Sequence, residues 1–268
     1  MTYLCPLCQA PLSQESNTLR CENRHQFDIA KEGYVNLLPV QHKRSKEPGD
    51  SKEMMQARRA FLEGNHYHPM REGVADVLKA NLPESEAMLL DIGCGEGFYT
   101  HYFADQLSDA TVYGMDISKT AIRYASKRYA NCRFSVASIQ RLPFPDASLD
   151  GVVRIYAPCN GEELNRVVKE NGILVTVTPA GRHLYQLKGL IYDEVRLHDI
   201  PPETLPGFTL ESEQNLHYPM KLTGQQAEWL LQMTPFAWRA SETVWETVRN
   251  AGVFDCEADF TLRIYRKR

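Results

Sequence analysis

The residues best suited to chemistry are three glycines that follow an apolar run. Residues 89–97 read Leu-Leu-Asp-Ile-Gly-Cys-Gly-Glu-Gly, so Asp91 lies in the apolar run and Gly93, Gly95 and Gly97 form the turn after it. Glycine has no side chain and tolerates positive φ, which lets the backbone approach a ligand closely. A helix that begins directly after the turn would offer its free N–H groups to a carboxylate or a phosphate. This order of strand, glycine turn and helix predicts the first unit of a doubly wound nucleotide-binding domain.

The glycine spacing separates two kinds of nucleotide ligand. Dinucleotide sites use G-x-G-x-x-G, whereas this chain has G-x-G-x-G, with Phe98 where the last dinucleotide glycine would stand. The next predicted strand ends at Asp116, and an acid about 20 residues after such a turn can accept hydrogen bonds from both ribose hydroxyls. The pattern resembles motif I of the class I methyltransferases that use S-adenosylmethionine. The cofactor-binding residues expected from it are Asp91, Gly93, Gly95, Gly97 and Asp116. A degenerate dinucleotide fold and a catalytically inactive domain are the alternatives.

A second group of chemically capable residues lies near the N-terminus. Cys5-Pro-Leu-Cys8 is followed, after the polar segment 9–20, by Cys21-Glu-Asn-Arg-His25. Each pair can bind one metal ion from a tight turn, and three thiolates with one imidazole complete a tetrahedral zinc shell that leaves no position for water. So small a module cannot build its own core, so metal binding would supply much of its folding free energy. These four residues are therefore predicted to bind one structural zinc ion; the alternative is a redox pair at Cys5 and Cys8.

Composition and charge narrow the classes of protein that this chain can be. Its 268 residues suffice for one large or two modest domains with a substantial core. The net charge of −4 gives no sign of nucleic-acid binding, although a whole-chain value can hide a local basic surface. No apolar run approaches the roughly 20 residues of a membrane helix, and we recognise no signal-peptide layout. Apart from the N-terminal cluster the cysteines are scattered, which favours a reducing cytoplasm over a disulfide framework.

The segment between the cysteines and the glycine turn is a candidate RNA surface. Residues 41–46 are basic, and a helix predicted over 51–63, capped by Ser51, carries further arginines. The cationic residues that could contact phosphates are Lys43, Arg44, Lys46, Arg58 and Arg59. A solvated linker is the alternative interpretation of this charge run. Beyond it, Tyr67 could lie over the methionine end of the cofactor, because aromatic rings attract sulfonium cations.

Strand and helix alternate through the rest of the predicted domain. Periodicity predicts strands over 112–116, 132–136, 149–155 and 173–178, and helices over 119–129 and 162–168. Ser118 is expected to cap the first of these helices and Gly172 to end the second. Parallel strands joined by helices bind ligands beyond their carboxyl ends. The glycine turn, Asp116 and Ser138, which stands where related folds contact adenine, should therefore meet in one crevice.

Residues 154–159 occupy the place where methyltransferases position the group that they modify. Many amino-methylating enzymes carry an acid or Asn, two prolines and an aromatic residue there. Arg154-Ile-Tyr-Ala-Pro-Cys159 keeps one proline and one aromatic residue, which argues against reaction at an exocyclic adenine amine. Tyr156 could stack on a base or pack in the core, and Arg154 could donate to guanine O6, so both are candidate catalytic residues. A nucleophilic role for Cys159 is not expected.

The C-terminal third adds one candidate ligand contact and a second candidate RNA surface. His183 follows the strand 173–178 and could reach the cofactor or the substrate, although a lone histidine is more often structural. The aromatic and basic run 233–239 includes Trp238 and Arg239, which could contact RNA; packing in the core is the alternative for Trp238. We also predict a strand-rich stretch over 205–218, a helix over 222–231 and an edge strand over 260–265. A last antiparallel strand would complete a sheet that is otherwise mostly parallel.

Together these residues resemble those of one family, the bacterial 23S rRNA guanine-N1 methyltransferases that modify a hairpin loop in domain II. The resemblance covers essentially the whole chain, including the cysteine cluster, the runs 31–39 and 55–61, the glycine turn, and residues 154–159 and 233–239. It implies structural zinc at the N-terminal cluster and a homodimer whose zinc modules and cores form an RNA cleft. It also implies cofactor contacts at Tyr67, Gly95, Glu96 and His183.

The resemblance also implies an organisation and a reaction. We expect a zinc-binding RNA-recognition module over 1–38, a basic linker with helices over 39–80, and an α/β class I methyltransferase domain with a Rossmann-like sheet over 81–268. The cofactors would be S-adenosylmethionine and one zinc ion, the compartment the cytoplasm, and the partner 23S rRNA rather than DNA or a membrane. Two branches of the family methylate guanine 745 or guanine 748, and the close overall match favours 745. A small-molecule methyltransferase and a non-catalytic zinc-containing RNA-binding factor are the alternatives.

Overall fold

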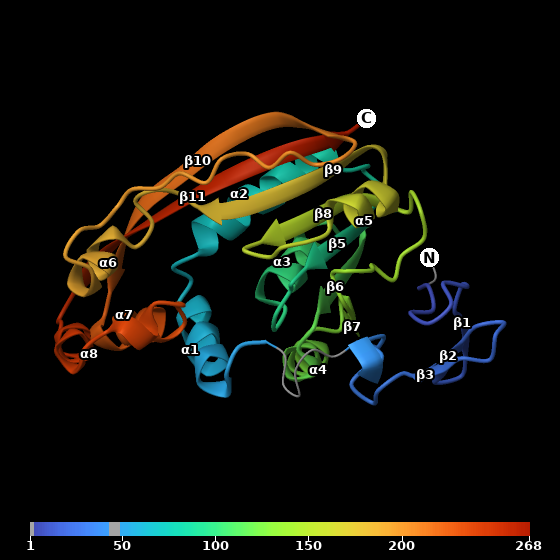
Figure 1. The fold of residues 1–268 in the computed structure, drawn as a ribbon, viewed down its shortest axis with the longest axis horizontal. Coiled ribbons are helices and arrows are strands. Elements are labelled where there is room, and N and C mark those ends of the chain that lie inside the picture. Colours follow the sequence, from blue (N-terminus) through green and yellow to red (C-terminus); the bar gives the residue numbers. More distant parts are fainter. Residues whose placement is uncertain (1–2, 43–48) are drawn as a thin grey trace.

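A mixed β-sheet forms the centre of the protein in the computed structural model, which describes residues 3–42 and 49–268. The sheet has eight strands within these residues, in the order β10-β11-β9-β8-β5-β6-β7-β4 (Figure 1). Their bounds are Val35–Asn36 (β4), Met88–Ile92 (β5), Thr111–Asp116 (β6), Arg133–Val136 (β7), Leu149–Ile155 (β8), Val168–Pro179 (β9), Phe208–Leu222 (β10) and Phe254–Lys267 (β11). The β10–β11 and β11–β9 pairs are antiparallel and the other pairs are parallel. The predicted sheet, mostly parallel with an antiparallel C-terminal part, is confirmed.

Helices connect the strands, and local sequence signals explain where several of them begin. The helices are α1 (Lys52–Glu63), α2 (His68–Asn81), α3 (Phe98–Gln106), α4 (Lys119–Arg128), α5 (Gly161–Val167), α6 (Tyr185–Ile191), α7 (Gly224–Gln232) and α8 (Glu242–Arg249), with short 3₁₀ turns at Val40–His42 and Ala237–Arg239. The hydroxyl of Ser51 accepts from the backbone N–H of Met54, and that of Ser118 accepts from Ala121. Each bond satisfies an otherwise unpaired amide of the first turn. Both predicted caps are confirmed.

Two predictions about the C-terminal half were wrong. The strand over 260–265 is no edge strand: β11 pairs with β9 on one side and with β10 on the other, so β10 forms the edge. Gly172 does not end a helix, because α5 ends at Val167 and Gly172 lies inside β9. A Cβ at Gly172 would stand 2.6 Å from Cγ1 of Val168 and 3.0 Å from the Asp150 carbonyl oxygen. The glycine therefore serves a close approach within the sheet.

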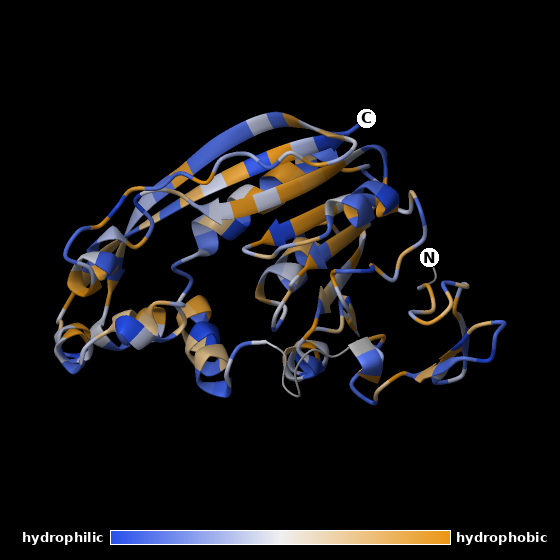
Figure 2. Ribbon diagram, in the orientation of Figure 1, coloured by the Kyte–Doolittle hydropathy of each residue, from blue (hydrophilic) through white to orange (hydrophobic). Residues whose placement is uncertain are grey.

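The apolar strands are buried on both faces, as expected of parallel strands covered by helices. On one face Val153, Val175 and Phe260 pack with apolar residues of α1, α2, α7 and α8. On the other face Val152 and Leu174 pack with residues of α5 and with the loop that contains Phe144. Figure 2 shows the central strands as the most hydrophobic part of the fold. Each fully buried side chain of this size contributes roughly 1.5–3 kcal/mol, so the core fixes the strand ends that carry the site.

The N-terminal module is joined firmly to the main sheet. Strands β1 (Ser13–Glu15), β2 (Thr18–Arg20) and β3 (Gln26–Asp28) form a small sheet of their own, and β4 then pairs in parallel with β7. The Leu4 amide donates to the Pro143 carbonyl at 3.0 Å. The Tyr3 ring packs against Phe144, with ring centroids 5.5 Å apart. The module and the rest of the described chain are therefore joined at one edge of the main sheet and through an aromatic contact.

The helices were also compared with the length and hydropathy that a membrane span requires. Among the residues described here, no helix meets both requirements.

Candidate cofactor and zinc sites

The four predicted zinc ligands lie together in the N-terminal module. Their ligand atoms all fall within 4.8 Å of one another. The Sγ atoms of Cys8 and Cys21 are 3.7 Å apart, and His25 Nδ1 lies 3.5 Å from Cys5 Sγ and 3.4 Å from Cys21 Sγ. A disulfide has its sulfurs only about 2.05 Å apart, so these cysteines are not bonded to one another.

These separations match the edges of a zinc tetrahedron. The edge of a tetrahedron is about 1.6 times the bond length, and a zinc–sulfur bond of about 2.3 Å gives an edge of about 3.7 Å. Three sulfurs and one imidazole would fill all four positions around a zinc ion and leave none for water, which is the pattern of a structural site. The turn after β2 carries Cys21 and His25, and the turn before β1 carries Cys5 and Cys8. The predicted ligand set therefore fits zinc.

The glycine turn after β5 has a positive φ at each of its glycines: 70° at Gly93, 54° at Gly95 and 82° at Gly97. Two of them are required by packing as well. A Cβ at Gly93 would lie 2.6 Å from the Cβ of Ala157, and one at Gly97 would lie 3.1 Å from the ring of Phe134. At Gly95, by contrast, a Cβ would meet no atom within 4 Å. Gly95 therefore faces open space, as a turn that holds a ligand must.

Asp116 stands beside this space at the end of β6. Its Oδ2 accepts from the Gly95 amide at 3.0 Å and its Oδ1 accepts from the Ser118 amide at 2.8 Å. Because each carboxylate oxygen can accept more than one hydrogen bond, both keep a lone pair for a ribose hydroxyl. Burial raises the pKa of Asp116 above its usual value. The geometry fits the ribose of S-adenosylmethionine.

Asp91 lies deeper, on β5 just before the glycine turn. It is 2 % exposed, and Thr100 Oγ1 on α3 donates to its Oδ2 at 2.7 Å. Burial raises the pKa of Asp91 to about 7, with a smaller contribution from the negative charge of Asp116. Thr100 therefore fixes the orientation of the Asp91 carboxylate just before the glycine turn.

Glu96, in the glycine turn, forms an ion pair with Arg59, a residue that the sequence had suggested as an RNA contact. Arg59 on α1 donates to Glu96 from Nε at 2.8 Å and from Nη2 at 2.6 Å. Its guanidinium also lies 3.7 Å from the ring centroid of Tyr124. Arg59 therefore binds the cofactor turn in this structure, and α1 covers the turn. One sequence signal for this contact is that Arg59 lies within three residues of the buried α1 residues Ala57, Phe61 and Leu62.

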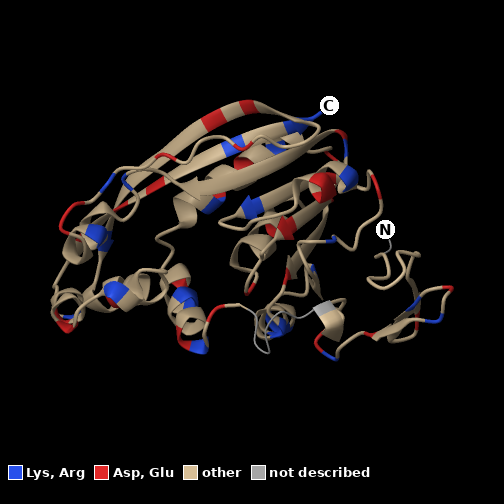
Figure 3. Cartoon of the chain, in the orientation of Figure 1, with Lys and Arg blue, Asp and Glu red and all other residues tan. Residues whose placement is uncertain are grey.

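The other predicted RNA contacts are spread along the molecule. Arg58 forms an ion pair with Asp50, whereas Lys43, Arg44 and Lys46 lie outside the described residues. Trp238 is 76 % exposed, and the Arg239 guanidinium lies 4.7 Å from its ring centroid. Trp238 is thus not a core residue. The zinc module and the α7–α8 region lie at opposite ends of the long axis (Figure 1), and Figure 3 shows basic residues interspersed with acidic ones between them.

Two tyrosines and one histidine converge beyond the ends of β8 and β9. The hydroxyl of Tyr67 lies 3.4 Å from His183 Nε2, and that of Tyr156 lies 3.3 Å from the same nitrogen. Phe260 packs against the imidazole with ring centroids 4.7 Å apart. Tyr67 and His183 are buried, whereas Tyr156 is 48 % exposed. Three residues predicted from separate segments are therefore brought together.

The hydrogen bonds of His183 determine which of its nitrogens carries the proton. Its Nδ1 accepts from the Asp259 amide at 3.1 Å, so the neutral ring carries its proton on Nε2. Burial, with a smaller contribution from the nearby charge of Lys188, lowers the pKa of His183 to about 3. His183 is therefore neutral at physiological pH and donates from Nε2 toward the tyrosine hydroxyls. It acts here as a hydrogen-bond donor and not as a base.

Arg154 and Tyr156 do not lie on the same side of the sheet. Arg154 is 4 % exposed, and its Nη2 donates to both carboxylate oxygens of Glu203 at 2.9 Å. Tyr156 has φ +59°, which ends β8 and turns its ring toward His183 on the opposite face. A non-glycine residue in this region is strained, and such strain is concentrated at functional sites. The structure therefore does not bring these two candidate residues together.

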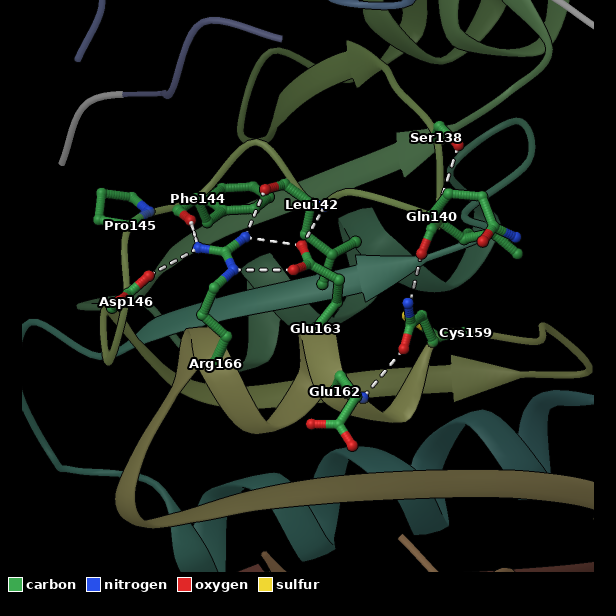
Figure 4. Close-up of polar contacts among 12 residues, drawn as sticks. Ser138, Gln140, Leu142, Phe144, Pro145, Asp146, Cys159, Glu162, Glu163 and Arg166 are labelled. Atoms are coloured by element: carbon green, nitrogen blue, oxygen red, sulfur yellow. Dashed lines mark hydrogen bonds and ion pairs between the residues drawn. The ribbon is translucent and has the colours of Figure 1, made fainter. Parts of the chain in front are cut away.

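Ser138 begins a loop that α5 holds in place. Its hydroxyl accepts from the Gln140 amide at 3.1 Å. Figure 4 shows Arg166 and Glu163 on α5 pointing at this loop. Arg166 donates to the carbonyl oxygens of Leu142 at 2.8 Å and Phe144 at 2.6 Å, and Glu163 accepts from the Leu142 amide at 2.7 Å. The i,i+3 spacing of Glu163 and Arg166 on α5 is the only sequence signal for this clamp, and neither residue was among the predicted site residues.

Comparison with known proteins identifies the parts of the chain that others share. The zinc-ribbon family described as "RlmA, N-terminal" matches residues 3–46, and the family described as "Methyltransferase domain" matches residues 89–172. The 23S rRNA (guanine(748)-N(1))-methyltransferase of Streptomyces fradiae is 32% identical over 87% of this chain and 85% of its own length. A Bacillus subtilis protein provisionally named a 23S rRNA (guanine-N(1)-)-methyltransferase is 31% identical over 99% of this chain and 97% of its own length. Among solved structures, the YcgJ protein of Bacillus subtilis aligns with a TM-score of 0.47 and 21% identity, covering 76% of this chain and 99% of that one.

Proposed function

Because this chain belongs to the family of 23S rRNA (guanine-N1)-methyltransferases, we propose that it methylates N1 of guanine 745 in a hairpin loop of that RNA. S-adenosylmethionine supplies the methyl group. An RNA substrate of this kind places the protein in the cytoplasm. The observation that carries the proposal is the contact between the two halves of the site: a Cβ at Gly93 would meet Ala157, so the cofactor turn lies directly beside Tyr156.

The residues of the site have separate tasks in this proposal. Asp116 binds the ribose hydroxyls, Gly95 leaves space for the nucleoside, and Asp91 orients the methionine end. Tyr67 and His183 line the methyl-bearing region, where His183 supplies a fixed N–H donor. Alignment of donor and acceptor accounts for much of the rate of such a displacement, because it replaces a bimolecular encounter by a fixed geometry. Tyr156 presents an exposed ring on which an unstacked base can lie.

Guanine N1 carries a proton that must leave as the new bond forms. His183 cannot accept it, because Nδ1 is occupied by the Asp259 amide and Nε2 already carries hydrogen. Buried Arg154 faces Glu203 on the other side of the sheet. A hairpin loop lowers the cost of bringing the guanine to this site, since a loop base is less stacked and paired than a duplex base.

The reaction is tested with 23S rRNA that lacks the modification and with methyl-labelled cofactor. We expect one methyl group on N1 of guanine 745, which blocks base pairing and stops primer extension beside that nucleotide. Transfer to guanine 748 would place the protein in the other branch. Transfer to small molecules without any transfer to rRNA would reject the proposed function, as would RNA binding without transfer.

We also propose that two copies of the chain bind the RNA together, with their zinc modules and cores forming one cleft. The exposed Trp238 and Arg239 would contact RNA at the end of the molecule that lies away from the zinc module. Light scattering during size-exclusion chromatography measures the mass directly. A mass near twice that of the chain is expected, and a monomer at micromolar concentration contradicts the dimer.

Cofactor affinity should rise between pH 6 and pH 8 through the ionisation of Asp91. Burial raises the pKa of this acid to about 7, so binding of the cofactor's ammonium group, which favours the carboxylate, releases a proton below that pH. We expect the dissociation constant of S-adenosylhomocysteine, measured by calorimetry, to fall by up to about tenfold per pH unit below pH 7 and to level off above it. The Asp91→Asn variant should bind more weakly with little pH dependence. A wild-type constant that does not change over this range would contradict the role of Asp91.

A further inference from the structure

A cavity of ≈ 500 Å³ lies between the zinc module and the methyltransferase core. The module contributes Leu4 and Pro6 to its wall, and the segment after β4 contributes Leu38. The core contributes Ile117, Ser138 and Ile139. This volume falls within the range of about 300–1,000 Å³ that is typical of small-molecule sites, and apolar side chains with a few polar groups are their usual lining.

The cavity begins where the ribose site ends. Ile117, in its wall, directly follows Asp116, and Ser138 directly follows Ala137, whose amide donates to the Asp116 carbonyl at 3.1 Å. In a nucleoside the base is attached to C1′, which is bonded to the carbon that carries the 2′-hydroxyl. A ribose whose hydroxyls bind Asp116 must therefore place its base within a few bond lengths of these residues.

The lining suits a purine. Ile117 is 37 % exposed and offers an apolar surface to the face of a ring. The Ser138 hydroxyl and the Gln140 side chain lie at the cavity and can pair with the polar edge of a base. Their loop is held by Arg166 and Glu163 of α5, so these groups are positioned before the ligand arrives (Figure 4).

We propose that the zinc module forms the outer wall of the adenine subsite, so that zinc binding and S-adenosylmethionine binding are energetically coupled. This inference rests on the proposed cofactor site. The module is held against the core by the Leu4–Pro143 hydrogen bond, the contact between Tyr3 and Phe144, and the β4–β7 pair. Zinc orders the module, so loss of the metal removes the wall. Because coupling between sites is reciprocal, the cofactor must in turn stabilise the zinc module.

Leu4→Trp and Leu7→Trp form a matched pair of variants in the full-length protein. Leu4 lines the cavity, whereas Leu7 is 44 % exposed and is not among the lining residues. Both variants should retain one zinc ion per chain. Calorimetry with S-adenosylhomocysteine should give at least a tenfold weaker dissociation constant for Leu4→Trp, because the indole fills the space for adenine, and an unchanged constant for Leu7→Trp. Wild-type affinity in a zinc-loaded Leu4→Trp protein would overturn the proposal.

Hydrogen exchange on the wild-type protein gives a second test that does not depend on how a variant folds. Saturating S-adenosylhomocysteine should slow exchange at the amides of Leu4 and Leu38 several-fold and leave α8, at the opposite end of the molecule, unchanged (Figure 1). Unaltered exchange at Leu4 and Leu38 in the saturated protein would overturn the proposal while leaving the proposed function intact. Failure of the wild-type protein to bind S-adenosylhomocysteine at all would instead reject the proposed cofactor site, on which this inference rests.

Discussion

Gly95→Arg should abolish cofactor binding and methyl transfer while the protein remains folded and zinc-loaded. The Cβ position at Gly95 has no neighbour within 4 Å, so a long side chain can project into the open space without displacing core residues. In the proposed cofactor site, the nucleoside lies in this space beside Asp116. We expect the affinity for S-adenosylhomocysteine to fall at least about 100-fold, which corresponds to about 2.8 kcal/mol. Calorimetry measures the loss, and circular dichroism with zinc analysis verifies the fold.

Gly95→Ala is the matched control, because it introduces the same backbone strain without the bulk. Any L-residue at φ 54° costs about 1–2 kcal/mol, and a methyl group at this position meets nothing. Alanine should therefore lower stability slightly and keep most of the cofactor affinity. Full methyl transfer by Gly95→Arg would show that the turn does not hold the cofactor.

Much of the fold was predictable because its signals are local. The strand over 149–155 is confirmed to the residue, since an apolar run bounded by polar and turn residues is enough to define it. The cap at Ser118 is also confirmed, because it depends only on a hydrogen bond to Ala121, three residues away. Whether β11 lies at the edge or inside the sheet could not be predicted from local signals. Whether a strand is an edge depends on a partner far along the chain. β10 supplies that partner along nearly all of its length, and its side chains alternate between more and less exposed only from Leu216 onward.

The candidate site was predictable as a set of strand ends and less so as a set of contacts. Spacing alone predicts the four zinc ligands, which the structure brings together. It also predicts Gly95 and Asp116, and the Gly95 amide donates to the Asp116 carboxylate. Tyr156 and Arg154 are two residues apart, and strand alternation would place both on one face. The left-handed conformation of Tyr156 breaks that alternation, and nothing in the residue type signals it. The partner of Arg59 is likewise a long-range contact, with Glu96.

The position of the zinc module also changes the role expected for it. A module of this size could have been a separate RNA-binding attachment on a flexible linker. Instead β4 extends the main sheet beside β7, and the loop after β7 forms one wall of the cavity that the module closes. Under the proposed function, a defect in the module should therefore weaken the binding of RNA at its outer surface and of the cofactor at its inner surface.

Cys21→Ser should lose zinc and, with it, the fold of the N-terminal module. Cys21 Sγ lies 3.7 Å from Cys8 Sγ and 3.4 Å from His25 Nδ1, so its loss removes one of the four corners of the tetrahedron. Metal binding supplies about 10–16 kcal/mol in small zinc modules, and the sheet of β1 to β3 is too small to fold without it. We expect less than one tenth of the wild-type zinc content, measured by mass spectrometry, and rapid proteolysis confined to the module.

The same variant should bind both ligands more weakly, and to different degrees. RNA affinity, measured by fluorescence anisotropy with a hairpin that contains the target guanine, should fall at least tenfold because the outer surface of the module is lost. S-adenosylhomocysteine should still bind, since Asp116 and the glycine turn are unaffected, but with the lower affinity of a subsite that lacks one wall. Cys132→Ser, at a half-buried cysteine remote from the metal cluster, controls for the chemical change. Undiminished RNA affinity in the zinc-free protein would show that the module does not bind RNA.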